Sequence, residues 1–467
     1  MNRVSSLAVV LVIVGTLCAS LAGWDWAKQA GSLCVLVYVV LEARKLIRGG
    51  WLMLAACSAI SLLALWFLPD AHKVLWRALG DGSYIIGLFA ALSLLRDASE
   101  SSPLVLQCGQ LMVRQPPGRR YQVLSWGTHV LSLVLNFGIL PLLGGMVMKG
   151  NTLEAAGGDP RIAEIRKQRM LTAILRGYAM MTVWSPLSVS FAVTQHAVTG
   201  LPWWHLLPLQ VVLTVIFMTL GWYMDRRAFP PSARAAIAQS GDRTPLSWAP
   251  AVRLTLLVSA VVAASLAVAA IEGQKPVIGA MQVVPVAAVL WLTVQHLDQG
   301  LAGAVLSALR RFAGRLSVSM PGFRNEFVML GGAMYFGTVL AAFLSPETVA
   351  HVISSLSLPP PILTVLLAWG MLLLARYGIS QIVTVTLLGG ALANLSHQGI
   401  NPLVLASGLM GAWALSACTT PVGAAALTMA RIGQVPVQTV SRDWNGGFSV
   451  VGALFLALWM LVLGLLV

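Results

Sequence analysis

Long apolar runs separated by short polar breaks occur along the whole chain. An α-helix rises about 1.5 Å per residue, so roughly 20 apolar residues cross the hydrocarbon core of a bilayer. The pattern therefore predicts an all-α polytopic membrane protein with about 11 spanning helices. The predicted spans lie near residues 4–23, 30–46, 50–68, 82–96, 168–200, 203–224, 251–271, 277–297, 326–345, 403–431 and 447–467.

Two further apolar stretches, 121–148 and 360–395, contain a break where a continuous span would not favour one. The first is interrupted by Asn136-Phe137-Gly138 and the second by Arg376-Tyr377-Gly378. A glycine and a charged or amide side chain at mid-span disfavour an uninterrupted helix in lipid. We interpret both stretches as re-entrant hairpins that enter and leave the membrane on one side.

Composition agrees with a lipid environment. The chain has 467 residues, of which 58% are hydrophobic and 10% charged, and its mean hydropathy is +0.82. The net charge of +14 does not indicate nucleic acid, because the basic residues flank apolar runs instead of forming an aromatic-rich basic face.

The five cysteines form no CxxC pair and indicate neither disulfides nor zinc. Residues 4–23 resemble a signal peptide, but we favour an uncleaved helix.

The basic residues predict the topology. With the N-terminus inside, they gather on the inner side only if both hairpins are re-entrant, and the C-terminus then lies outside. This indicates a bacterial-type inner (cytoplasmic) membrane. The outer loops receive Lys28, Lys73, Arg77 and Lys275. The inner loops receive Arg44, Lys45, Arg48, Arg96, Arg119, Arg120, Lys149, Arg161, Arg166, Lys167, Arg169, Arg226, Arg227, Arg234, Arg310, Arg311, Arg315 and Arg431.

Two pairs of segments form an internal repeat. LVLNFGILPLLGG resembles LLARYGISQIVTVTLLGG, and the Ser-Pro within GYAMMTVWSPLSVSFAVTQ resembles the Thr-Pro within GAWALSACTTPVGAAALTMA. Gly138 and Pro186 are 48 residues apart, and Gly378 and Pro421 are 43. Because the two hairpins open from opposite sides, the repeat is inverted. The predicted organisation is 1–79 extra scaffold helices, 80–225 first repeat with broken helix 168–200, 226–250 cytoplasmic linker, and 251–467 second half with broken helix 403–431.

Broken helices point to a binding site, since backbone groups freed at a break cannot face lipid and must line an enclosed polar site. Helix N-termini there offer N–H groups to anions. Arg376 would bind an anionic substrate by charge-assisted hydrogen bonds, or it snorkels to the interface. The predicted substrate-binding residues are Asn136, Phe137, Gly138, Ser185, Pro186, Ser188, Arg376, Tyr377, Gly378, Ser380, Gln381, Thr419, Thr420 and Pro421.

These motifs resemble the ion transporter superfamily, which includes divalent-anion/sodium symporters, arsenite permeases and the large membrane subunit of TRAP transporters. The resemblance covers about residues 80–465. It implies two hairpins with Ser-Asn-Thr-like tips, each followed by an unwound helix. Asn136 looks like the tip asparagine, and Ser380 stands where the second tip hydroxyl would be. The residues similar to the unwound segments are Trp184, Ser185, Pro186 and Ser188 in the first repeat and Thr419, Thr420 and Pro421 in the second.

The sequence therefore predicts a secondary active transporter that moves a small or amphiphilic anion by an elevator-type alternating-access mechanism. The alternatives are a TRAP-like membrane subunit with an accessory subunit, a membrane-embedded enzyme or lipid-handling membrane protein, and a channel. No enzyme motif and no cofactor is expected, and a metal site is unknown. Na⁺ and H⁺ both stay open as coupling ions; His129 and His196 are candidates for proton coupling. Membrane lipid and a homodimer partner are further expectations, whereas Glu42, Asp298 and Glu326 are expected to pair with basic residues.

Overall fold

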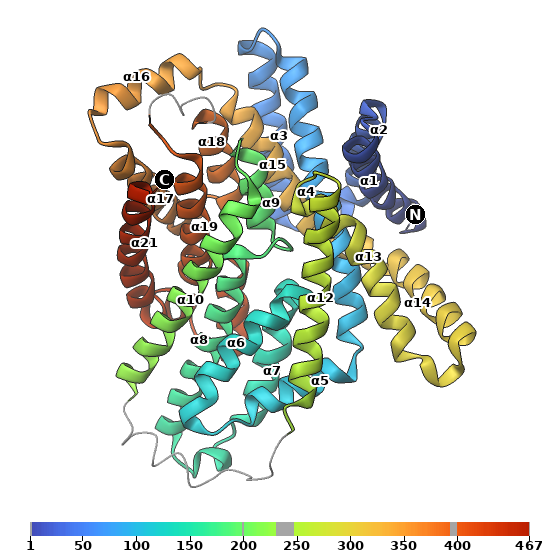
Figure 1. Cartoon of the computed structure of the whole chain (residues 1–467), viewed down its shortest axis with the longest axis vertical. Coiled ribbons are helices and arrows are strands. Elements are labelled where there is room, and N and C mark those ends of the chain that lie inside the picture. The colour runs from blue at the N-terminus through green and yellow to red at the C-terminus, as the bar shows by residue number, and fades with distance from the viewer. Residues whose placement is uncertain (1, 199, 230–246, 393–398, 467) are drawn as a thin grey trace.

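A computed structural model describes residues 2–198, 200–229, 247–392 and 399–466. Every regular element in this part of the chain is a helix, which confirms the all-α prediction (Figure 1). Ten helical segments among these residues are long and apolar enough to cross a membrane, and the number becomes 11 if the bent α16–α17 pair is one span. The number of spanning helices therefore agrees with the prediction, while the sidedness of the termini stays a prediction.

One group of helices, the scaffold bundle, is formed by residues 2–100 and 249–341. Within it, α1 packs against α2, α12 against α13, and α4 against both α13 and α15. Its members are α1 (Asn2–Ala22), α2 (Asp25–Glu42), α3 (Arg48–Phe67), α4 (Ala71–Glu100), α12 (Ala249–Ile271), α13 (Pro276–Gln295), α14 (Leu301–Gly322) and α15 (Arg324–Ala341).

The other group, the hairpin bundle, contains both predicted hairpins and both broken helices. Two helices of 11 residues each, α5 (Pro103–Val113) and α16 (Pro346–Leu356), connect it to the scaffold bundle. The members of the hairpin bundle are α6 (Pro117–Leu135), η2 (Asn136–Gly138), α7 (Ile139–Gly150), α8 (Pro160–Trp184), α9 (Val189–Ala197), α10 (Trp203–Ala228), α17 (Pro360–Arg376), α18 (Gln381–Leu392), α19 (Pro402–Thr419), α20 (Ala424–Gly433), the π-helical turn η7 (Thr439–Trp444) and α21 (Gly446–Leu466).

The chain reverses between α6 and α7. A straight helix over the 34 residues Pro117–Gly150 would be about 51 Å long. Instead, a Cβ at Gly150 would lie 3.8 Å from Cγ1 of Val113, which is four residues before α6 begins. The turn is made at Asn136, whose φ is 47° and ψ −129°. The stretch 121–148 is therefore a helical hairpin, and its re-entry into a membrane stays a prediction.

A second reversal separates α17 from α18. Gly378, with φ +92°, lies in the turn, and the chain after α18 returns to the start of α17, where a Cβ at Gly399 would lie 3.1 Å from Cγ of Pro360. Residues 393–395 of the predicted hairpin 360–395 lie outside the described residues. A bend of 109° before α17 sets α16 across the direction of the hairpin.

The two halves pack reciprocally. Helix α7 of the first hairpin packs against α20, the second half of the other broken helix, and α18 of the second hairpin packs against α9. The long parts of the broken helices, α8 and α19, pack against each other. Corresponding elements also have similar lengths: α7 and α18 have 12 residues each, and α9 and α20 have 9 and 10. This arrangement fits an inverted repeat.

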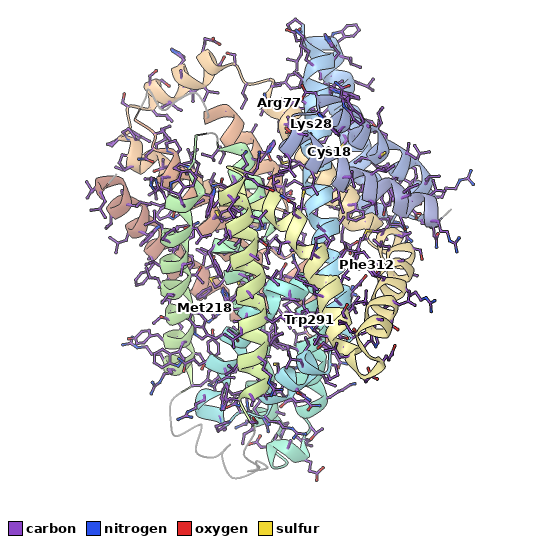
Figure 2. The ribbon with its side chains drawn as sticks, turned by 45° about the vertical axis from the view of Figure 1, so that its right-hand side comes forward. Cys18, Lys28, Arg77, Met218, Trp291 and Phe312 are labelled. Atoms are coloured by element: carbon purple, nitrogen blue, oxygen red, sulfur yellow. The ribbon has the colours of Figure 1, made fainter. Side chains whose placement is uncertain are left out.

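Glu42 is paired with basic residues. Its buried carboxylate contacts Ser5, Lys45 and Arg324 at 2.8, 3.3 and 3.1 Å, which confirms the expected pairing of Glu42. Lys28 and Arg77, both predicted in outer loops, lie near each other (Figure 2). The side of the membrane that each loop faces stays a prediction.

Arg176, which lies inside the predicted span 168–200, joins four elements of the hairpin bundle. Its Nε donates to Asn445 Oδ1 at 2.9 Å, and its two terminal nitrogens donate to the Tyr121 hydroxyl at 3.2 Å and the Trp444 carbonyl at 3.0 Å. The guanidinium also lies 4.3 Å from the ring centroid of Phe448. A buried charge is tolerable when its donors are satisfied in this way, so Arg176 has a structural explanation.

Three helices were not predicted, namely α5, α14 and α16. Helices α5 and α16 are too short to span a bilayer. Helix α14 carries Arg310, Arg311 and Arg315, and it is amphipathic and largely exposed on its polar face. A hydropathy pattern predicts long apolar runs, so it does not indicate short or strongly amphipathic helices of these kinds.

Candidate functional site

The first helix break is closed by a network of buried serine hydroxyls. Pro186 has no N–H and ends α8 at Trp184. Ser185 Oγ accepts from the Leu187 N–H at 3.1 Å, Ser188 Oγ donates to the Ser185 carbonyl at 2.7 Å, and the same Ser188 oxygen accepts from the Phe191 N–H at 3.2 Å as the N-cap of α9. Ser185 and Ser188 are thus occupied in supporting the break.

The second break is less enclosed. Thr420 Oγ1 donates back to the Ser416 carbonyl at 2.7 Å, and Thr419 Oγ1 to the Leu415 carbonyl at 3.1 Å, so both hydroxyls satisfy carbonyls of α19. Helix α20 then begins after Gly423, which provides no side-chain cap. The first N–H groups of α20 consequently have no capping side chain, unlike those of α9.

The tip of the second hairpin lies against this second break. Gln381 Nε2 donates to Ser416 Oγ at 3.1 Å, and a Cβ at Gly378 would lie 3.2 Å from Cγ2 of Val422. Arg376 and Tyr377 are exposed, and Tyr377 is 79% exposed. Arg376 forms no ion pair with the described residues. The structure therefore brings together Gly378, Gln381, Thr420 and Pro421 and leaves the arginine beside them available to solvent or ligand. Ser380, next to Gln381, is half-buried.

The tip of the first hairpin is held by neighbouring helices. Phe137 packs edge-to-face on Tyr178 of α8 with centroids 6.1 Å apart. A Cβ at Gly138 would lie 2.8 Å from Nε of Arg96, so a larger residue there would require this arginine side chain of α4 to shift. Asn136 is half-buried, and its amide has no hydrogen-bond partner in the described part of the chain. Arg96 was predicted only as a topology residue, and its contact with the tip was missed.

The predicted residues thus form two groups. One contains the second tip and the second break, and the other contains the first tip, whose Phe137 rests on α8. Within the described ranges, no hydrogen bond or ion pair joins the two tips directly.

A polar cavity of about 320 Å³ lies elsewhere, between α9 and the scaffold bundle. Its centre is Asp81, 4% exposed, whose Oδ1 lies 2.9 Å from His196 Nε2 and whose Oδ2 accepts from Thr338 Oγ1 at 3.1 Å. The His196 ring packs against the Tyr84 ring at a tilt of 35°, with centroids 5.1 Å apart. Lys275 Nζ donates to the Gln195 carbonyl at 3.1 Å. Other polar residues that line the cavity are Thr16, Ser20, Asp25, Lys28, Ser83 and Gln274.

Sequence reasoning identified His196 as a candidate but missed Asp81, because residue 81 precedes the predicted span 82–96. The other candidate histidine, His129, has a different setting. Its Nε2 accepts from Trp184 Nε1 at 2.9 Å, and no carboxylate contacts it in the described residues. His129 therefore joins α6 to α8 beside the first break.

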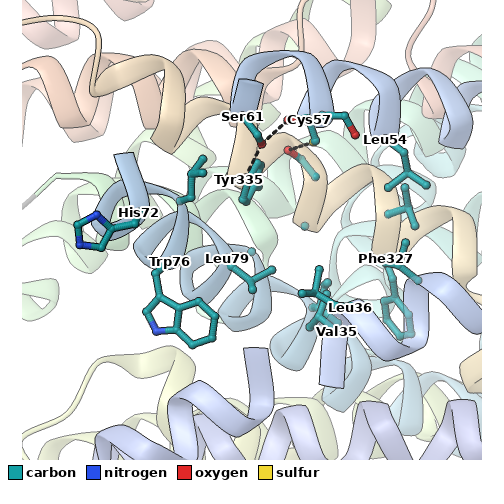
Figure 3. Close-up of a pocket in the computed structure, with 18 residues that line it drawn as sticks. Val35, Leu36, Leu54, Cys57, Ser61, His72, Trp76, Leu79, Phe327 and Tyr335 are labelled. Carbon is teal, nitrogen blue, oxygen red and sulfur yellow. Dashed lines mark hydrogen bonds between the residues drawn. The ribbon is translucent and has the colours of Figure 1, made fainter. Parts of the chain in front are cut away.

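An apolar cavity of about 400 Å³ lies within the scaffold bundle, among α2, α3, α4 and α15 (Figure 3). Its few polar contacts are internal: Ser61 and Tyr335 hydroxyls lie 2.7 Å apart, and Cys57 Sγ donates to the Gly332 carbonyl at 3.4 Å. His72 and Trp76 lie at one side of it. Such a lining suits a hydrocarbon chain better than a charged solute.

The comparisons with known proteins show the fold. No protein-family profile and no curated protein matches the sequence. Among solved structures, the YdaH transporter of Alcanivorax borkumensis, described as having an unusual topology, matches with a TM-score of 0.54 at 15% identity. The match covers 90% of this chain and 98% of that one. The chain is thus a multi-pass membrane protein with a transporter-like fold.

Proposed function

We propose that this protein is a secondary active transporter of a small or amphiphilic anion in the inner membrane. The observation that carries the proposal is the group formed by the second hairpin tip and the second break. There, the exposed Arg376 lies beside Gly378 and Gln381, and the uncapped start of α20 follows Pro421. A guanidinium and free helix N–H groups are both donors suited to a carboxylate or a similar anion.

The transport mechanism is of the elevator type. The hairpin bundle carries the anion site, and it shifts against the scaffold bundle so that the site opens alternately to each side. The separation of the chain into two bundles joined by α5 and α16 supports this mechanism. The buried serines and threonines at the breaks support it too, because an element that moves as a unit needs its backbone groups satisfied internally.

The proposal is tested by uptake into proteoliposomes of two radiolabelled probes, benzoate as an amphiphilic anion and succinate as a small dicarboxylate. We expect saturable uptake of at least one probe by the wild-type chain and a loss of about tenfold in Arg376→Ala, with partial recovery in Arg376→Lys. Arg310→Ala, which removes an exposed arginine of α14, is the matched control and should leave uptake unchanged.

Saturable uptake that is equal in Arg376→Ala and wild type would remove Arg376 from the site. If neither anion is taken up but lipid exchange between vesicles is accelerated, the lipid-handling alternative is favoured, for which the apolar scaffold cavity is the supporting feature. Co-purification of a second protein with the wild-type chain would favour the TRAP-like alternative.

A further inference from the structure

The Asp81–His196 pair joins two parts of the molecule that the proposed mechanism moves apart. Asp81 is on α4 of the scaffold bundle, and His196 is in the last turn of α9 in the hairpin bundle. Their side chains meet at 2.9 Å, and Thr338 of α15 holds the other carboxylate oxygen. A displacement of α9 along α4 by one helical turn, about 5 Å, breaks this contact.

Charged and polar groups surround the pair on several sides. Asp81 is almost completely buried, so its carboxylate needs a cation or a proton close by. The C-terminal end of α9 adds a partial negative charge at His196. Three basic residues of the scaffold bundle counter this negative charge: Lys275, Lys28 and Arg77. Asp25 is a second acidic residue in the same cavity. Helices α18 and α13, which also pack nearby, contain no titratable residue.

Unpartnered polar atoms surround the pair. The Tyr84 hydroxyl, Thr194 Oγ1 and Gln195 Nε2 are buried and have no hydrogen-bond partner among the described residues. Thr194 and Gln195, at 0% and 3% exposed, directly precede His196. Buried polar atoms are almost always satisfied, so a set of three beside a polar cavity points to water molecules that connect the pair to the cavity.

We propose that Asp81 and His196 together bind the coupling proton of the transport cycle. In the conformation described, one proton resides on the imidazole and the carboxylate is ionised. When α9 leaves α4, the Nε2–H bond breaks, its electron pair stays on the ring, and the proton passes to water in the 320 Å³ cavity. The carboxylate stays with Thr338 and the nearby lysines. This inference rests on the proposed function, and it selects H⁺ over Na⁺.

The test measures the separation of the two bundles directly, without a substrate. Spin labels are placed at Lys73→Cys on α4 and Trp204→Cys at the start of α10, both exposed, after the five native cysteines are replaced by alanine. Distances are measured by pulsed electron paramagnetic resonance in liposomes between about pH 6 and pH 9. We expect the population with the altered distance to rise at least about threefold as pH rises and the imidazole loses its proton.

His196→Gln keeps a hydrogen-bond donor but cannot titrate, and Asp81→Asn keeps the shape of the carboxylate. Both should make the distance distribution independent of pH. His351→Gln, which removes an exposed histidine of α16, is the matched control and should respond as the wild type does. A pH response that survives in both pair variants overturns the proposal, as does a wild-type distribution that does not change with pH.

Proton movement is followed in parallel with a pH dye inside proteoliposomes during benzoate or succinate uptake. We expect a pH change in the wild type and its loss in Asp81→Asn. Uptake that needs Na⁺ and moves no proton would overturn the proton site but leave the proposed transport function standing. A pH-dependent distance change in a protein that transports neither probe would overturn the proposed function and leave the proton site standing.

Discussion

At the residue scale, Arg176 shows how a buried charge is stabilised by contacts within the protein. Its guanidinium donates to the Tyr121 hydroxyl of α6, to the Trp444 carbonyl and to the side-chain amide of the adjacent Asn445, and it covers the Phe448 ring. Arg376, in contrast, is exposed, and it has no ion-pair partner in the described residues. The two arginines look alike in an apolar stretch of sequence, and only their surroundings distinguish the arginine with a structural explanation from the one proposed to bind the substrate.

Arg176→Met is therefore expected to destabilise the hairpin bundle. The change leaves the Asn445 amide oxygen and the Trp444 carbonyl buried without their donor, at a cost of about 3 kcal/mol. Thermal unfolding of the detergent-purified protein should show a lower midpoint than the wild type. Arg310→Met, on the exposed face of α14, should change the midpoint little; equal effects in the two variants would contradict the structural role of Arg176.

At the element scale, the sequence predicted the helix breaks more reliably than the helix contacts. Breaks are local: a proline without an N–H and a glycine at a turn leave a signal within a few residues, as at Pro186 and Gly378. The pairing of Asp81 with His196 depends on how α9 packs beside α4, and no local pattern encodes that packing. Serine hydroxyls that satisfy backbone groups beside the break could be predicted from the sequence, but the specific hydrogen-bond partners of Ser188 could not.

The close packing of α6 and α8 gives a test of the first repeat. A Cβ at Gly177 would lie 2.3 Å from the Ser125 carbonyl oxygen, so Gly177→Ala forces these helices apart. We expect a loss of stability of about 2 kcal/mol, measured as a lower unfolding midpoint. In Gly145→Ala of α7 the new methyl meets no atom within 4 Å, so this variant should be neutral or slightly stabilising. A neutral Gly177→Ala would mean that α6 and α8 are further apart than described.

At the scale of the whole molecule, the charge pattern predicts which loops lie on each side of the membrane, and that sidedness stays a prediction. The sequence could not divide the helices into scaffold and hairpin bundles, because the α4–α15 and α13–α4 contacts join distant segments. Nor could it identify α5, α14 and α16, whose lengths or charges lie outside the pattern of a spanning helix.

The predicted sidedness is testable with single cysteines in intact cells. Lys73→Cys, at the end that contains Lys28 and Arg77, should react with a membrane-impermeant maleimide added outside. Glu154→Cys, in the exposed loop after the first hairpin, should react only after the cells are permeabilised. The reverse pattern would invert the topology and place the Asp81–His196 cavity on the cytoplasmic side.

The connectors α5 and α16 also act as tethers of limited length. Residues 357–359 are all that joins α16 to the second hairpin, and three extended residues span only about 10 Å. A longer excursion of the hairpin bundle therefore requires α16 itself to tilt or to slide along the membrane surface. In the proposed elevator mechanism, the distance that the hairpin bundle moves is thus limited by the freedom of this short helix as well as by the thickness of the bilayer.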